Sequence, residues 1–174
     1  MRLETPRLVI RSFEPGDDEA LLRVFSDPEV RRFLPPAPEP TLERMRAGVQ
    51  RRMDTERDRG YALWAVQRKD TGTLIGNCAL MPVEGTGPEV EIAYHYAHEA
   101  WNRGYGTAAA VACLAHGLGS IGLERIIAIC FPENVGSWRV MEKAGMRYEG
   151  VASYYGLTGL KKYLADRATW SLPS

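Results

Sequence analysis

The middle of the chain constrains the fold most, because it contains three strand-like runs in succession. Runs rich in aromatic and aliphatic side chains span residues 61–68, 73–83 and 90–96. Short segments rich in Gly, Asp and Pro separate them at 70–72 and 85–88, and such segments form turns. The first two runs are therefore expected to form a hairpin, followed by a third strand.

Helical and strand patterns alternate on both sides of this region. Further strands are predicted at 8–13, 125–131, 146–154 and 161–170, and helices at 17–25, 41–53, 107–118 and 134–144. Strands that form hairpins, mixed with helices, favour an α/β (mixed α+β) domain. The prediction is a mostly antiparallel, seven-stranded mixed sheet flanked by helices. With 174 residues and no repeat or linker, the chain is expected to be a single domain over residues 1–174.

Composition excludes several classes of protein. Lys and Arg number 22, as do Asp and Glu, so the basic excess typical of a nucleic-acid-binding protein is missing. No apolar run is long enough to span a bilayer, and the N-terminus lacks the apolar core of a signal peptide. Three widely spaced cysteines fit buried, reduced thiols. A cytoplasmic protein that binds neither nucleic acid nor membranes is expected.

The segment Trp101-Asn102-Arg103-Gly104-Tyr105-Gly106-Thr107 carries the densest chemical signal. Closely spaced glycines let several backbone N–H groups point the same way, and the following helix adds its positive end. This arrangement is suited to a phosphate. It is no P-loop, because the lysine is missing, and a dinucleotide fingerprint would place the glycines directly after the strand. His95 and His98 lack a third ligand nearby, so no metal is expected.

A second segment, residues 132–146, predicts a capped helix. Asn134 stands at the N-cap, Ser137 falls at the third helical position, and Gly145 ends the helix. Whether Asn134 and Ser137 only cap the helix or also meet a ligand stays open on the residues alone.

Four motifs in this order resemble the GNAT superfamily of acetyl-CoA-dependent N-acetyltransferases, closest to the branch with the ribosomal-protein alanine N-acetyltransferases. They are Leu3-Glu4-Thr5-Pro6-Arg7-Leu8-Val9-Ile10-Arg11, Glu91-Ile92-Ala93-Tyr94, the Trp-x-x-Gly-Tyr-Gly-Thr turn and the Asn-x-x-Ser…Glu-Lys-Ala-Gly-Met helix. The likeness covers almost the whole chain. The motifs are specific in combination rather than singly.

The resemblance implies acetyl-CoA as cosubstrate and a fold in which the strands at 90–96 and 125–131 splay apart to admit the pantetheine arm. Backbone groups near Tyr94 and Tyr96 would bind the pantetheine amides. The pyrophosphate would lie on the turn formed by Asn102, Arg103, Gly104, Tyr105, Gly106 and Thr107. Asn134 would contact the pantetheine side of the cofactor, and Ser137 would lie near its sulfur.

Acetyl transfer needs a neutral amine, and Glu91 is the best candidate for the general base because apolar neighbours would raise its pKa. Glu89 shares its face and is the substitute, with bulk water as the third option. Ser137 would donate a proton or only a hydrogen bond to the departing sulfur.

The acceptor stays open between a protein N-terminal α-amine and a small amine. A non-catalytic acyl-CoA-binding module is the alternative from another functional class. The sequence does not fix the oligomeric state, and a homodimer is one of the states it allows.

Overall fold

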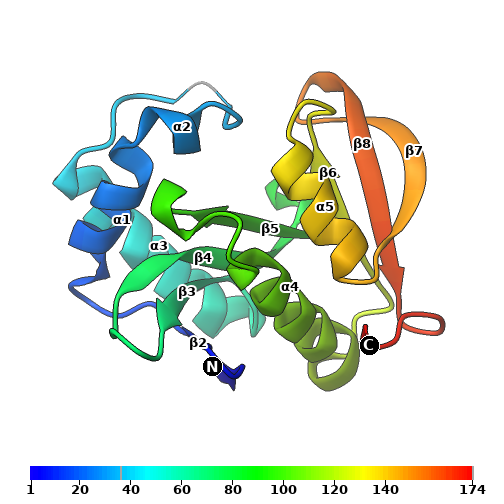
Figure 1. Ribbon diagram of the computed structural model, residues 1–174, viewed down its shortest axis with the longest axis horizontal. Coiled ribbons are helices and arrows are strands. Elements are labelled where there is room, and N and C mark those ends of the chain that lie inside the picture. Colours follow the sequence, from blue (N-terminus) through cyan, green and yellow to red (C-terminus); the bar gives the residue numbers. More distant parts are fainter. Residues whose placement is uncertain (36, 174) are drawn as a thin grey trace.

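One twisted sheet runs through the protein, a computed structural model that describes residues 1–35 and 37–173. Its eight strands follow the order β1-β2-β3-β4-β5-β6-β8-β7 (Figure 1). They are β1 (Arg2–Glu4), β2 (Leu8–Arg11), β3 (Leu63–Arg68), β4 (Leu74–Pro82), β5 (Val90–Tyr96), β6 (Arg125–Cys130), β7 (Arg147–Tyr154) and β8 (Leu157–Asp166). The mixed sheet is confirmed. The predicted count of seven omitted β1, which pairs with β2.

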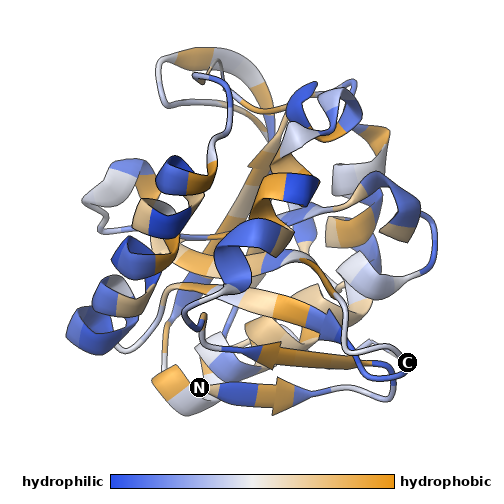
Figure 2. Cartoon of the chain, turned by 90° about the vertical axis from the view of Figure 1, so that its left-hand side faces the viewer, coloured by the Kyte–Doolittle hydropathy of each residue, from blue (hydrophilic) through white to orange (hydrophobic). Residues whose placement is uncertain are grey.

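Helices cover the two faces of the sheet. The helices are α1 (Asp17–Ser26), α2 (Pro28–Arg31), α3 (Leu42–Arg59), α4 (Tyr105–Ala115) and α5 (Val135–Lys143). Leu21 of α1 and Val49 of α3 pack against Ala65 of β3 on one face. On the other face, α4 and α5 contribute to the main hydrophobic core. Figure 2 looks onto the α1–α3 side, where hydrophilic residues predominate on the helices.

The sheet opens between its two central strands. β4 and β5 are paired from Gly76↔Tyr96 to Pro82↔Val90, whereas the parallel strands β5 and β6 share a single register pair, Glu91↔Ile127. Every other pairing is antiparallel and longer than this one. The strands therefore part beyond Glu91, toward their carboxyl ends, as the resemblance implied.

Several details differ from the pattern-based expectation: for example, α3 continues to Arg59, and α4 begins at Tyr105 rather than at 107. The first helix ends before Pro28 as expected, but the proline also begins a second helix, α2. Asp27 caps α2 by accepting a hydrogen bond from the N–H of Glu29. The last strand begins earlier and ends earlier than predicted. Tyr155 and Gly156 both have positive φ and make the tight turn between β7 and β8.

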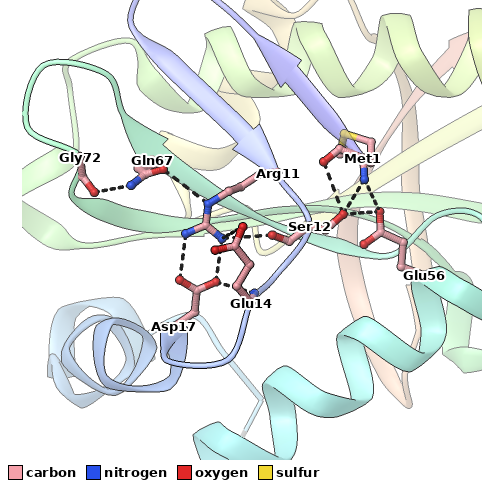
Figure 3. A network of polar contacts seen from close by, with 8 residues as sticks. All are labelled: Met1, Arg11, Ser12, Glu14, Asp17, Glu56, Gln67 and Gly72. Carbon is pink, nitrogen blue, oxygen red and sulfur yellow. Dashed lines mark hydrogen bonds and ion pairs between the residues drawn. The ribbon is translucent and has the colours of Figure 1, made fainter.

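A polar network fastens the N-terminal strands to the helices (Figure 3). Arg11 donates two hydrogen bonds to Asp17, at 2.8 and 2.9 Å, which is a bidentate pair. The amino group of Met1 lies 3.3 Å from a carboxylate oxygen of Glu56 on α3. Within the described residues, no helix combines the length and the apolar character needed to cross a bilayer.

Candidate active site

The glycine-rich turn presents unpaired backbone donors at the start of α4. Gly104 is the N-cap residue and adopts a left-handed conformation, with φ of 76°. Among the described residues, the N–H groups from 102 to 107 donate no backbone–backbone hydrogen bond. Free N–H groups at a helix N-terminus favour an anion. The predicted cradle thus has the geometry that a phosphate needs.

Side chains hold this turn in place. The Trp101 indole donates to the carbonyl of Tyr96 at 2.8 Å, which ties the turn to the end of β5. Arg7 donates to the carbonyl of Arg103 at 2.7 Å, and its guanidinium lies 4.7 Å from the centre of the Tyr105 ring. The pattern analysis missed Arg7 as a charge at the turn. No local signal could reveal it, because it lies far away in the sequence.

Gly106 has a packing role in addition to the one expected. A Cβ at this position would lie 3.3 Å from Val140 of α5 and 3.4 Å from the Tyr96 ring. The first distance is tighter than most contacts and the second is at the limit of ordinary contact, so a glycine here lets α4 approach α5 and β5 closely.

Tyr94 spans the space between the open strand and α5. Its hydroxyl donates to the carbonyl of Ser137 at 2.9 Å and lies 3.3 Å from the Ser137 hydroxyl. Asn134 caps the helix as predicted, because its side chain accepts from the N–H of Ser137 at 3.2 Å. The Tyr94 and Tyr96 rings stack at 6.2 Å. The structure therefore brings four of the predicted residues together beside the opening.

Glu91 lies on the opposite face of β5, at the point where β5 and β6 begin to part. Its exposed fraction is only 5%, and burial raises the pKa of its carboxyl above the usual range. The Tyr155 hydroxyl donates a short hydrogen bond to it, which opposes that rise. A carboxylate that is buried yet hydrogen-bonded in its ionised form is suited to accept a proton near neutral pH.

Tyr155 is held by a reciprocal contact with Glu84. The N–H of Tyr155 donates to the Glu84 carboxylate at 2.7 Å, and the N–H of Glu84 donates to the Tyr155 hydroxyl at 3.0 Å. Both residues have left-handed backbones, with φ near 55°: 56° for Tyr155 and 54° for Glu84. Strained residues held by specific contacts gather at functional sites. The contact orients the phenol toward Glu91.

Glu89 is the weaker candidate for the base. Its carboxylate accepts from Lys162 at 3.0 Å and from Tyr154 at 2.9 Å. Partial burial opposes ionisation, but these two hydrogen bonds outweigh it and lower the pKa of Glu89. A paired carboxylate of low pKa is a poor proton acceptor.

The two histidines considered as metal ligands have other neighbours. His95 shares a hydrogen bond of 3.1 Å with Asn77, and His98 lies 3.9 Å from Asp27. Over residues 1–35 and 37–173, no three His, Cys, Asp or Glu side chains are grouped to hold a metal ion. All three cysteines are buried and free.

Comparison with known proteins shows what this chain resembles. The profile of the acetyltransferase (GNAT) domain matches residues 7–147. An uncharacterised N-acetyltransferase of Bacillus subtilis (strain 168), YnaD, is 35% identical over 150 residues, which is 86% of this chain and 85% of the relative. A GNAT-family acetyltransferase structure from Bacillus anthracis is 32% identical, with a TM-score of 0.82 over 97% of this chain and 99% of that one.

More distant structures share the fold. A ribosomal-protein alanine acetyltransferase from Vibrio fischeri superposes with a TM-score of 0.83 at 16% identity, over 98% of this chain and 99% of that one. The microcin self-immunity acetyltransferase MccE, solved with acetyl-CoA and AMP, gives 0.78 at 15% identity, with 93% of each chain covered. Sequence and fold agree with the open sheet and the glycine turn: the chain belongs to the GNAT family of acetyl-CoA-dependent acetyltransferases.

Proposed function

We propose that the protein transfers the acetyl group of acetyl-CoA to a primary amine, with Glu91 as the general base. One observation carries the proposal: the buried carboxylate of raised pKa lies where β5 and β6 part. In this family, that opening is where the thioester is expected. The acceptor amine would then meet the base beside the acetyl carbon.

The cofactor side is formed largely by backbone. The N–H groups of Asn102 to Thr107 would bind the pyrophosphate, with Arg103 and Arg7 adding charge at the edge. Backbone groups near Tyr94 and Tyr96 would bind the pantetheine amides once the arm enters between β5 and β6. Asn134 would lie on the pantetheine side, and Ser137 near the sulfur.

Acetyl transfer requires the acceptor amine to lose one proton. An α-amine has a pKa of about 7.7–8.0 and a lysine side chain about 10.4, so an α-amine needs less help at neutral pH. The amine nitrogen forms the new bond to the acetyl carbon, the carbon–sulfur bond breaks, and Glu91 takes the proton. Ser137 would donate a hydrogen bond to the departing sulfur.

A protein N-terminal α-amine is the acceptor class to test first. The fold likeness to the Vibrio fischeri ribosomal-protein alanine acetyltransferase supports this choice, and a small amine is the second candidate. The buried, free cysteines support a cytoplasmic setting.

The test measures free thiol released from acetyl-CoA in the presence of an amine panel. A panel of N-terminal peptides, free lysine and polyamines covers both acceptor classes. We expect thiol release that depends on the amine. Normal CoA binding without such release would favour the non-catalytic acyl-CoA-binding module and contradict this proposal.

A further inference from the structure

Arg52 of α3 is a cation without a counter-ion. Its Nε is buried with no hydrogen-bond partner, and no described carboxylate pairs with its guanidinium. The guanidinium lies 5.3 Å from the centre of the Phe13 ring, against the α1–α3 core. Burial, and secondarily the charge of Arg51, lower the pKa of Arg52 to about 10, which leaves it charged at neutral pH. The side chain as a whole is half-buried, and a partly desolvated charge without a partner favours the binding of an anion.

Other arginines of α3 contrast with Arg52. Arg46 pairs with Asp18 at 3.3 Å, and Arg57 pairs with Asp54 at 2.9 Å. Further arginines of this helix also lack a carboxylate partner, but among the described arginines of α3 only Arg52 has a buried nitrogen without a hydrogen bond.

Asn77 of β4 adds a second unpaired donor on the same face of the sheet. Its side chain has 0% exposure, and its Nδ2 has no partner among the described residues. Its Oδ1 accepts from Nδ1 of His95, because an amide oxygen can only accept. Burial, with the charge of Arg52 as the next cause, lowers the pKa of His95 to about 4. Neutral His95 therefore offers no positive charge of its own, and Arg52 is the cation of this group.

His95, which contacts Asn77, lies on the same face of β5 as Glu91. The side chains of Glu91, Ala93 and His95 point to the α1–α3 side, and Ala93 and His95 are only half-buried. Four residues of strand span about 13 Å. The carboxylate of an α-amino acid is too close to its own amine to reach from Glu91 to His95. A longer acceptor would reach.

We propose that Arg52, with Asn77, binds the carboxylate of an acceptor whose amine is presented to Glu91. The acceptor class is an amine that carries a carboxylate several bonds from its nitrogen. The inference rests on the proposed function, since it names the substrate of that same site. Two sources share this chemistry: a small amino acid with a distant amine, and a peptide N-terminus with an acidic side chain.

Two matched pairs of acceptors test this. The first is 6-aminohexanoate and 6-aminohexanamide, which differ only in the carboxylate. The second is the dipeptide amides Ala-Glu and Ala-Gln, which separate a peptide source from a small-molecule source. We expect kcat/KM to favour the acid of at least one pair by about 10-fold or more, the usual strength of a charged hydrogen bond.

Variants then assign the preference to Arg52. In Arg52→Met the ratio of acid to amide should fall to near one. Arg51→Gln is the matched control, because it removes an exposed neighbouring charge, and it should keep the ratio. Equal rates for acid and amide in the unaltered protein, in both pairs, overturn the proposal whether or not the variants fold. A ratio that survives in folded Arg52→Met overturns it as well.

A binding measurement separates this inference from the proposed function. In calorimetry, 6-aminohexanoate and the Ala-Glu amide are each titrated into the unaltered protein and into both variants, all with CoA bound. Binding that is lost only in Arg52→Met supports the carboxylate site even if no amine is acetylated, in which case the proposed function alone fails. Absence of binding by both probes, or equal binding to all three proteins, contradicts the site.

Discussion

The two faces of strand β5 differ in what they offer a ligand. On the α4–α5 face, the turn at 102–107 offers backbone N–H groups, and the tyrosines beside it are packed in the main core. On the α1–α3 face, Glu91 and Asn77 are buried side chains and Arg52 is half-buried, and Asn77 and Arg52 each have a nitrogen without a hydrogen-bond partner. Backbone donors serve a cofactor that every member of a family shares. Buried side chains can change from member to member, so the second face is suited to select the acceptor.

The largest expected effect is on turnover, from Glu91→Gln. Loss of a general base should lower kcat by about 10²–10⁴-fold, with CoA affinity unchanged. The loss should shrink as the pH rises toward the pKa of the amine, and should be smaller for an α-amine than for a lysine-like amine. Rate profiles against pH with both acceptor types measure this. A variant as active as the parent at pH 7 would pass the role to Glu89 or to bulk water.

The same variant should change the dependence of stability on pH. Burial raises the folded-state pKa of Glu91 above its unfolded value, so its contribution is fully present below the unfolded pKa. That contribution is lost as the pH rises through the folded pKa. Thermal melts should therefore show Glu91→Gln gaining stability relative to the parent as the pH rises from 4 to 8. A constant difference would mean that the folded-state pKa is not raised.

On the other face, Gly106→Asp should weaken CoA binding by at least about 100-fold, because it adds a negative charge to the turn that would bind the phosphates. Gly106→Ala is the matched control, since it tests the tight contacts with Val140 and Tyr96 without adding charge. Calorimetry on folded variants decides the matter. Equal CoA affinity in Gly106→Asp and Gly106→Ala would remove this turn from the phosphate site.

A smaller effect is expected from Tyr155→Phe, about 10-fold on kcat/KM at acidic pH. The Tyr155 hydroxyl stabilises the ionised form of Glu91, so its loss should raise the pKa of Glu91 and move the acid limb of the profile to higher pH. At high pH the two enzymes should converge. A uniform loss at every pH would point to a purely structural role for the tyrosine.

The smallest effect belongs to Ser137→Ala, a fall in kcat of about 2–10-fold, the strength of one neutral hydrogen bond. The Tyr94 hydroxyl would keep its stronger bond to the backbone carbonyl of residue 137, so folding should be little affected. Stopped-flow measurement of thiol release isolates the chemical step. An unchanged rate across pH would exclude assistance to the departing sulfur by this hydroxyl.

The local parts of the fold and site could be predicted from sequence, because they depend on neighbours along the chain. The bounds of β5 and the cap by Asn134 are as expected, and a glycine turn leads into α4, although the helix begins at Tyr105 rather than at 107. Glycine spacing, capping residues and alternating apolar residues act over a few positions, so one sequence reveals them.

The rest depends on contacts between distant segments. Tyr155 reaches Glu91 across 64 positions, and Arg7 reaches the turn across 96. Arg52 stands on a helix whose outward face is rich in Arg and Glu, and nothing in the helical pattern marks its Nε as buried. Its lack of a partner becomes visible only when α3 is packed against the sheet.

A crystal structure with CoA bound tests the division between the two faces most directly. We expect the pyrophosphate within hydrogen-bond distance of the N–H groups at 102–107, and the thiol end in the opening between β5 and β6. The α1–α3 face, with Glu91 and Arg52, should remain free of the cofactor. Phosphates bound to Arg52, or a cofactor that enters from the α1–α3 side, would contradict the account.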